Sequence, residues 1–284
     1  MTAPDPRPDL PPDDPALAAR AAFCRDLAEE AGRIALRGFR RRDPADITLK
    51  GAQDFLTETD AAVEAHLRAR ILETFPEDRF LGEEGGGTAS GRSLWVVDPI
   101  DGTANFARAV AHFCTAIAYV RDGITEIGCI LNPVTGEIWF ARRMQGATLN
   151  GAPIRVSGTR DFAAACLELG WSRREPQETY LGVLSRLLTQ GANVRRGASG
   201  ALGLAWVADG RSDGYAELHM NSWDCLAGLL LVAEAGGCVS ALPADGLVAG
   251  GAVLAATPEL AGAVSEATGI ALAPAQATRK GPMA

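Results

Sequence analysis

The first third of the chain carries two segments with the apolar spacing of amphipathic helices. The first repeats apolar residues every three or four positions: Leu17, Cys24, Leu27, Ala31 and Ile34. It follows Asp14 and Pro15, a helix cap and a favoured first-turn residue, and we expect it to end near Arg42. The second runs from about Asp60 to Phe75, where Pro76 ends it.

The middle of the chain changes to strand-like runs. Residues 93–97 form a short apolar run, and residues 114–142 hold three such runs separated by Asp122-Gly123 and Asn132-Pro133. Successive strands joined by tight turns predict an antiparallel sheet. After Asn150-Gly151 the patterns alternate: helices over 176–189, 199–208 and 223–235, and strands over 213–218 and 252–256. Alternation of this kind predicts a layered α/β fold with mixed sheets.

The two ends differ from the rest. The first fifteen residues contain six prolines and four aspartates and lack the basic start and apolar run of a signal peptide. We expect residues 1–13 to be a disordered tail and residues 271–284 to be frayed. Because no Pro/Gly/Ser-rich linker divides the remainder, residues 14–270 are expected to form a single unit, with an α+β half to residue 150 and an α/β half over 151–270.

Composition excludes several classes of protein. Apolar residues are 47% and charged residues 22%, which is typical of soluble globular chains. The net charge of −8 argues against a general nucleic-acid or anionic-membrane surface, although it leaves room for a local basic patch. No apolar stretch is long enough to span a membrane. The six cysteines are scattered without a CxxC pair, which favours free thiols in a reducing cytoplasm over a disulfide framework.

The most informative segment follows the apolar run at 93–97. Asp98 ends the run, and after Pro-Ile comes Asp101, so two carboxylates and one backbone carbonyl can point at a single position. Hard divalent cations prefer such oxygen ligands. Gly102 and Thr103 then open a segment whose N–H groups, as at a helix N-terminus, can bind phosphate oxygens. Asp-Pro and Asp-Gly are also common turn formers, so the segment alone fits a turn equally well.

Three other acidic segments are ambiguous when taken singly. Glu83-Glu84 follows a short strand-like run and fits a solvated charge pair. Asp224 lies in the first turn of a predicted helix, where it fits a cap or a partner for the helix dipole. Thr57 and Asp60 fit a capping box.

Together these segments resemble the inositol monophosphatase family, whose members are metal-dependent, lithium-sensitive phosphatases of small phosphomonoesters. The resemblance lies in GEE at Gly82, WVVDPIDGTANF at Trp95 and WDCLAG at Trp223, and it covers about residues 14–266. It implies a layered αβαβα fold, a homodimer, and two or three Mg²⁺ ions at the junction of the sheets, with Mn²⁺ as an alternative metal.

The resemblance also implies roles for individual residues. The metal ligands would be Glu83, Asp98, the carbonyl of Ile100, Asp101 and Asp224. A third ion would lie near Glu83, held mostly by water, with Asp60 and Thr103 orienting the attacking water. Substrate would contact Asp101, Gly102, Thr103, Ser199, Gly200, Glu217 and Asp224.

Electrostatics independently favours metals at such a site. Two carboxylates 4 Å apart repel by roughly 4 kcal/mol at an effective dielectric near 20, and a phosphate dianion adds further repulsion. Oxygen ligands favour Mg²⁺ or Mn²⁺ over zinc, and His66, His112 and His219 lack metal-ligand spacing. The chain has no G-x-S-x-G, Walker or Rossmann pattern, so direct attack by metal-activated water is the simplest chemistry.

Substrate choice is less determined. Glu217 favours a polyol, and myo-inositol monophosphate is the leading substrate. Ala198 replaces a common glycine of the family, and Asn221-Ser222 replaces the His-Cys of animal members. Histidinol phosphate is the main alternative, although Trp223 favours inositol phosphate. Bisphosphate nucleotidase, fructose-bisphosphatase and a catalytically silent regulatory member are further alternatives.

Overall fold

The computed structural model describes residues 14–41, 47–51, 54–87, 91–243 and 245–274. The disordered tail expected over residues 1–13 lies outside the described residues, as does the frayed tail apart from residues 271–274.

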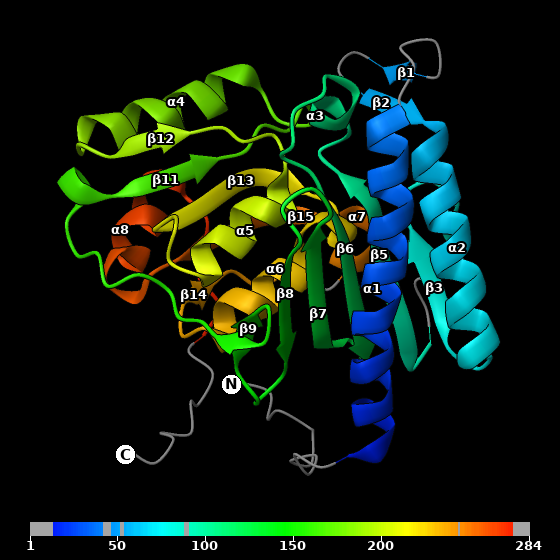
Figure 1. Cartoon of the computed structure of the whole chain (residues 1–284). Helices are drawn as coiled ribbons and strands as arrows, with labels where there is room; N and C mark the ends of the chain where they lie inside the picture. Colours follow the sequence, from blue (N-terminus) through cyan, green and yellow to red (C-terminus); the bar gives the residue numbers. More distant parts are fainter. Residues whose placement is uncertain (1–13, 42–46, 52–53, 88–90, 244, 275–284) are drawn as a thin grey trace.

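Five layers of helix and sheet make up the described structure (Figure 1). Helices α1 (Pro15–Arg41) and α2 (Glu58–Thr74) cover one face of an eight-stranded sheet. Helices α5 (Gly200–Ala208) and α6 (Ser222–Glu234) lie between that sheet and a five-stranded sheet. Helices α4 (Gln177–Thr189) and α8 (Pro258–Thr268) cover the outer face of the second sheet. The predicted αβαβα layering is therefore confirmed.

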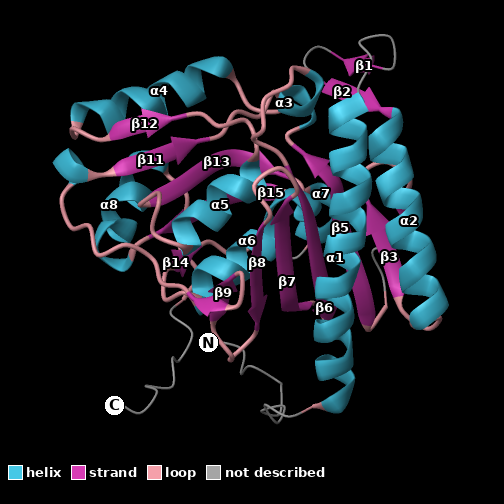
Figure 2. Ribbon diagram, viewed as in Figure 1, coloured by secondary structure: helices cyan, strands magenta, loops and turns pink. Residues whose placement is uncertain are grey.

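The larger sheet is mixed and has the order β10-β9-β8-β7-β6-β5-β3-β4. Figure 2 shows the part of this sheet from β9 to β3. Its strands are β3 (Arg79–Gly82), β4 (Gly86–Gly87), β5 (Ser93–Asp101), β6 (Cys114–Arg121), β7 (Ile124–Asn132), β8 (Glu137–Arg142), β9 (Ala147–Leu149) and β10 (Ala152–Pro153). Strands β5 to β8 form the antiparallel ladder that the turn residues predict, and β3 pairs with β5 in parallel.

The smaller sheet has the order β12-β11-β13-β15-β14. Its strands are β11 (Cys166–Leu169), β12 (Asn193–Arg195), β13 (Gly214–Met220), β14 (Cys238–Val239) and β15 (Gly251–Ala256). Short elements complete the structure: β1 (Ile47–Gly51), β2 (Asp54–Thr57), α3 (Thr103–Ala107), a 3-10 turn (Phe162–Ala164) and α7 (Gly246–Ala249).

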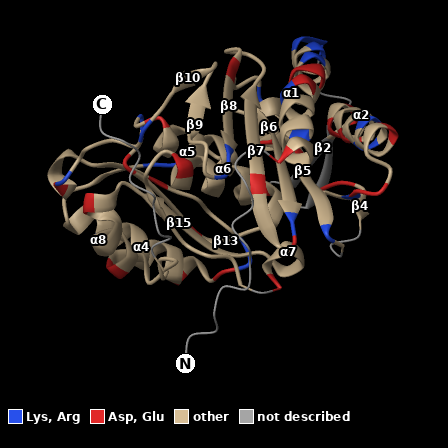
Figure 3. Cartoon of the chain, turned by 90° about the horizontal axis from the view of Figure 1, so that it is seen from below, with Lys and Arg blue, Asp and Glu red and all other residues tan. Residues whose placement is uncertain are grey.

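Side chains alternate across both sheets, and this alternation separates three apolar clusters. On β5, Trp95 and Val97 face α1 and α2, whereas Val96 faces α5 and α6. On β13, Tyr215 faces the same central helices, whereas Ala216 faces the outer ones. Figure 3 shows charged residues of both signs on α1 and α2, whereas most residues of the strands are uncharged. The central helices are therefore enclosed by both sheets.

The predicted elements agree with the structure except at a few places. The first helix ends at Arg41, and the Thr57–Asp60 capping box opens α2. Strand β5 does not stop at Asp98 as expected but continues to Asp101, because a bulge absorbs the intervening residues. All six cysteines are described and free, with Cys166 and Cys238 only half-buried. Among the described residues, no helix is long and apolar enough to cross a membrane.

Candidate active site

A bulge at the end of β5 directs two carboxylates to one place. Asp98 pairs with Ala116 and Asp101 with Cys114, so Pro99 and Ile100 together oppose one residue of β6. Proline suits this position because it has no N–H to lose from the ladder. The Ile100 N–H donates to Asp98 Oδ1 at 2.9 Å, which fixes the first carboxylate. Bulges next to active sites commonly redirect side chains in this way.

Asp98, Asp101 and Asp224 form a cluster in which one oxygen of each lies within 4.8 Å of the others. Asp224 comes from the first turn of α6, where it completes a capping box and accepts the Asn221 N–H at 3.0 Å. Burial and the charge of Asp101 raise the pKa of Asp224 to about 7. Burial and the neighbouring acids, Glu83 first among them, hold the pKa of Asp98 well above its ordinary value.

This donor set fits a divalent cation. Asp98 and Asp101 are buried, Asp224 is half-buried, and all three have raised pKa values, because their ionised forms repel one another and have little water around them. A cation between their oxygens would offset both effects, and an all-oxygen set suits Mg²⁺ or Mn²⁺. The three histidines lie outside the cluster: His66 contacts Glu30, His219 contacts Arg174 and His112 packs on Trp206.

Glu83 lines the same cavity as the cluster and lies beside Asp98. Its segment is held by Glu64 of α2, a residue not predicted from the sequence. The two Glu64 oxygens accept the N–H groups of Glu84 and Gly85, each at 2.8 Å. A Cβ atom on Gly85 would lie 2.6 Å from Glu64 Oε1, so a larger residue there would push this carboxylate aside. The four-residue spacing from Asp60 could have indicated a second buried acid on α2.

The structure places Asp60 and Thr103 next to each other. Thr103 opens α3 after Gly102, whose φ of 92° lies in the left-handed region. The Thr103 hydroxyl lies 2.9 Å from the Ile100 carbonyl oxygen and 3.4 Å from Asp60 Oδ1. Burial raises the pKa of Asp60 to about 6, although the Thr57 hydroxyl and N–H oppose the shift.

Ser199 and Gly200 lie against Asp101. The Ser199 hydroxyl donates to Asp101 Oδ2 at 2.5 Å, and the Ala201 N–H donates to the same oxygen at 2.8 Å. The Gly200 N–H approaches Asp101 Oδ1 at 3.3 Å. These bonds place Asp101 at the N-terminus of α5, where a carboxylate satisfies otherwise unpaired N–H groups.

Asn105 of α3 ties the same loop down from the other side. Its side-chain amide donates to the carbonyl oxygens of His112 at 2.7 Å and Gly197 at 2.9 Å. It also approaches the carbonyl of Ala198, whose φ of 60° is unusual for a residue other than glycine. Asn105 could not be assigned this role from sequence, because two of its three partners lie more than ninety residues away along the chain.

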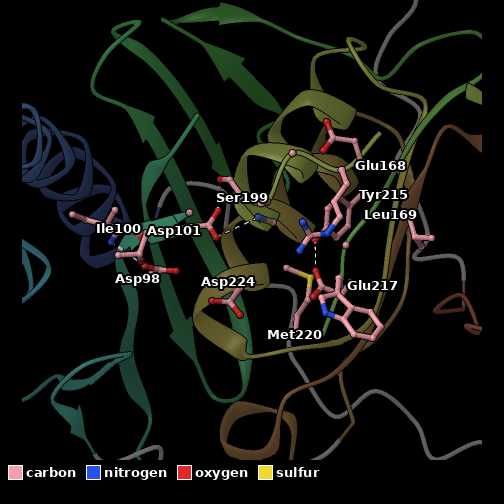
Figure 4. A pocket seen from close by; sticks show the side chains of 18 of the residues that line it. Asp98, Ile100, Asp101, Glu168, Leu169, Ser199, Tyr215, Glu217, Met220 and Asp224 are labelled. Carbon is pink, nitrogen blue, oxygen red and sulfur yellow. Dashed lines mark hydrogen bonds between the residues drawn. The ribbon is translucent and has the colours of Figure 1, made fainter. Parts of the chain in front are cut away.

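Glu217 lies on β13, across the cavity from Asp224 (Figure 4). The cavity has a volume of about 210 Å³ and contains every metal and substrate residue expected from the sequence, whereas Asp60 lies behind Thr103. Trp171 and Arg196 line it as well. Burial raises the pKa of Glu217 to about 8, partly opposed by a hydrogen bond from Tyr215.

The sequence matches a known protein family and named relatives. The model of the inositol monophosphatase family matches residues 17–276. A relative from Pseudomonas aeruginosa, named Nus factor SuhB, is 40% identical over 75% of this chain and 82% of its own length.

Solved structures show the same fold. The extragenic suppressor protein SuhB of Bartonella henselae has a TM-score of 0.81 at 29% identity and covers 88% of this chain and 98% of its own. The inositol monophosphatase of Anabaena has a TM-score of 0.77 at 32% identity and covers 89% and 96%. From its sequence and its fold, the chain belongs to the inositol monophosphatase family.

Proposed function

We propose that the protein is a Mg²⁺-dependent phosphomonoesterase whose leading substrate is a myo-inositol monophosphate. The observation that carries the proposal is the convergence of Asp98, Asp101 and Asp224 at one end of a cavity that has Glu217 across from them. Acids at one end suit a metal-bridged phosphate, and a polar group at the other suits the hydroxyls of a polyol.

In this proposal the metal ligands are Glu83, Asp98, the Ile100 carbonyl, Asp101 and Asp224. Bound Mg²⁺ would polarise the phosphoryl group and activate water for attack. Gly102 and Thr103 would bind phosphate oxygens through N–H groups at the start of α3. The Thr103 hydroxyl would orient the water and accept its proton while passing its own proton to Asp60 Oδ1, which lies 3.4 Å behind it.

The substrate contacts follow from the other walls of the cavity. Ser199 and Gly200 would contact the sugar-like ring where they border Asp101, and Glu217 would hydrogen-bond a ring hydroxyl. Histidinol phosphate, the main alternative, would instead place an amine near Glu217.

A substrate panel tests the proposal. Phosphate release would be measured from myo-inositol 1-phosphate, histidinol phosphate, adenosine 3′,5′-bisphosphate and fructose 1,6-bisphosphate, each with Mg²⁺ and with a chelator. We expect chelator-sensitive release with the highest kcat/KM for inositol phosphate. A clear preference for histidinol phosphate would overturn the substrate, and no Mg²⁺-dependent release from any compound would overturn the activity.

The names of the relatives favour a second candidate function. Proteins 36–40% identical to this chain are named Nus factor SuhB, which suggests a partner in the transcription machinery. This candidate function conflicts with the expectation that the protein has no nucleic-acid partner. That expectation stays a prediction. An Asp98→Asn variant distinguishes the two functions, since a partner role would survive the loss of the metal site.

Assembly and location are proposed on the family resemblance. We propose a homodimer that is located in the cytoplasm and inhibited by lithium. Analytical ultracentrifugation tests the dimer, and phosphatase assays with LiCl against KCl test the inhibition.

A further inference from the structure

Tyr215 and Glu217 form a hydrogen-bonded pair on the wall of the cavity. Both side chains lie on the same face of β13, two residues apart, and that face is directed toward α5 and the cavity. The Tyr215 hydroxyl donates to Glu217 Oε2 at 2.5 Å, and Figure 4 shows the bond between the two labelled side chains. Tyr215 is 3% exposed, so its hydroxyl has little access to water as an alternative partner.

Three glycines surround the pair. A Cβ atom on Gly170 would lie 2.0 Å from Glu217 Oε2 and 2.5 Å from the Tyr215 hydroxyl. A Cβ atom on Gly203 would lie 2.6 Å from the Tyr215 ring, and one on Gly200 would lie 3.0 Å from its hydroxyl. Contacts this short would force the neighbours to move, so the close fit around Tyr215 depends on these glycines.

The direction of the bond assigns different roles to the two oxygens of Glu217. Oε2 accepts from Tyr215, which leaves Oε1 for a group inside the cavity. If the carboxyl holds a proton, the proton lies on Oε1, because Oε2 is already an acceptor. In either protonation state the group offers one oriented hydrogen bond, and a substrate hydroxyl can both donate and accept.

On the basis of the proposed phosphatase function, we propose that Tyr215 is a positioning residue that fixes Glu217 and thereby selects phosphate esters that carry hydroxyl groups. Without the Tyr215 hydroxyl, Glu217 is free to turn away from the substrate or toward Arg196, which lines the same cavity. Ordering the carboxyl before substrate binds removes part of the entropy cost of binding.

The test compares Tyr215→Phe with the wild-type protein on two substrates. Phenylalanine keeps the ring among the three glycines and removes only the hydroxyl. We expect kcat/KM for myo-inositol 1-phosphate to fall about tenfold through KM, and kcat/KM for ethyl phosphate, which has no hydroxyl, to change less than twofold. Equal losses on both substrates, or none on either, would overturn the proposal.

Two further variants show whether Tyr215 acts through Glu217. Glu217→Ala should lose the same selectivity, and adding Tyr215→Phe to it should have no further effect, which is the signature of one coupled pair. Tyr119→Phe is the matched control, since Tyr119 is 1% exposed, donates to Ser93 Oγ at 3.0 Å and does not line the cavity. Full additivity of the two site variants would contradict the proposal.

Calorimetric binding of the same two compounds separates this inference from the proposed activity. A protein that releases no phosphate but prefers inositol phosphate, and loses that preference in Tyr215→Phe, would refute the activity and support the role of Tyr215. A protein that hydrolyses both esters with equal kcat/KM would refute the role of Tyr215 alone. A protein that binds neither compound would refute both.

Discussion

Each carboxylate of the acidic cluster has a partner of its own in the backbone or in a nearby loop. Asp98 accepts the Ile100 N–H, Asp224 accepts the Asn221 N–H and Asp101 accepts the Ala201 N–H. These bonds fix the oxygens before any cation arrives, which lowers the cost of binding one. Asp224, for example, completes a helix capping box and also belongs to the acidic cluster, so the two interpretations of this residue are compatible.

Replacing Asp98 tests the cluster directly. Asp98→Asn should lower phosphate release by roughly 100-fold or more, because an amide binds Mg²⁺ poorly. It should not destabilise the metal-free fold, because the substitution removes one of several repelling acids. Steady-state kinetics and urea unfolding measure the two effects. Unchanged turnover would contradict the metal assignment.

The raised pKa of Glu217, about 8 against an ordinary 4.5, makes stability depend on pH. Between these values the folded state holds the proton more tightly than the unfolded state does, so the free energy of unfolding falls as pH rises. The Glu217→Gln side chain cannot titrate. As pH rises from 5 to 9, the free energy of unfolding of this variant should therefore increase relative to that of the wild type by at least about 1 kcal/mol. Denaturant unfolding at both pH values measures this, and a constant difference would refute it.

At the scale of elements, α2 and the loop after β3 are joined through Glu64. Glutamine has one carbonyl acceptor, so Glu64→Gln would leave the N–H of Glu84 or Gly85 unsatisfied. We expect a loss of about 1–3 kcal/mol in the free energy of unfolding and weaker Mg²⁺ binding, measured by urea unfolding and calorimetry. Glu58→Gln, exposed in the first turn of the same helix, is the control; it removes only a favourable interaction with the helix dipole and should cost less than about 1 kcal/mol.

Close approach of β7 and α6 depends on Gly128. A Cβ atom there would lie 2.7 Å from the Ala227 carbonyl oxygen, so Gly128→Ala should cost roughly 1–3 kcal/mol by thermal or urea unfolding. Gly262 lies within α8 with open space around its would-be Cβ, and Gly262→Ala should instead stabilise by about 0.5–1 kcal/mol. Equal effects of the two substitutions would contradict this packing argument.

Some elements could be predicted from the sequence because their signals are local. The periodicity of α1, the turns between β6 and β8, and the acidic motifs each lie within a few residues of chain. The bulge in β5 was missed because it depends on pairing with β6. Glu64, Asn105 and Tyr215 were missed because their partners or their surroundings are set by the fold.

At the scale of the whole molecule, the site joins both sheets and the helices between them. Asp98 and Asp101 come from the eight-stranded sheet, Glu217 from the five-stranded sheet and Asp224 from a central helix. A ligand bound among them therefore contacts three of the five layers. Binding to the folded state alone raises the free energy of unfolding.

Mg²⁺ should for this reason raise the unfolding temperature of the whole chain. At 100 times its Kd the gain is about 2.7 kcal/mol, and each kcal/mol corresponds to roughly 2–4 °C for a chain of this size. Differential scanning calorimetry with Mg²⁺ and with a chelator measures the shift. Asp98→Asn should abolish it, and a shift that persists in this variant would place the ion elsewhere.

The bonds from Asp101 to residues 199–201 have a consequence for exchanging specificity between relatives. One carboxylate anchors the start of α5 and also belongs to the acidic cluster. A grafted 195–201 loop that lacked the Ser199 hydroxyl would remove one of the two hydrogen bonds to Asp101 Oδ2 and so loosen a carboxylate of the acidic cluster. Transplants of this loop will therefore transfer substrate preference faithfully only if the donor loop supplies an equivalent hydroxyl.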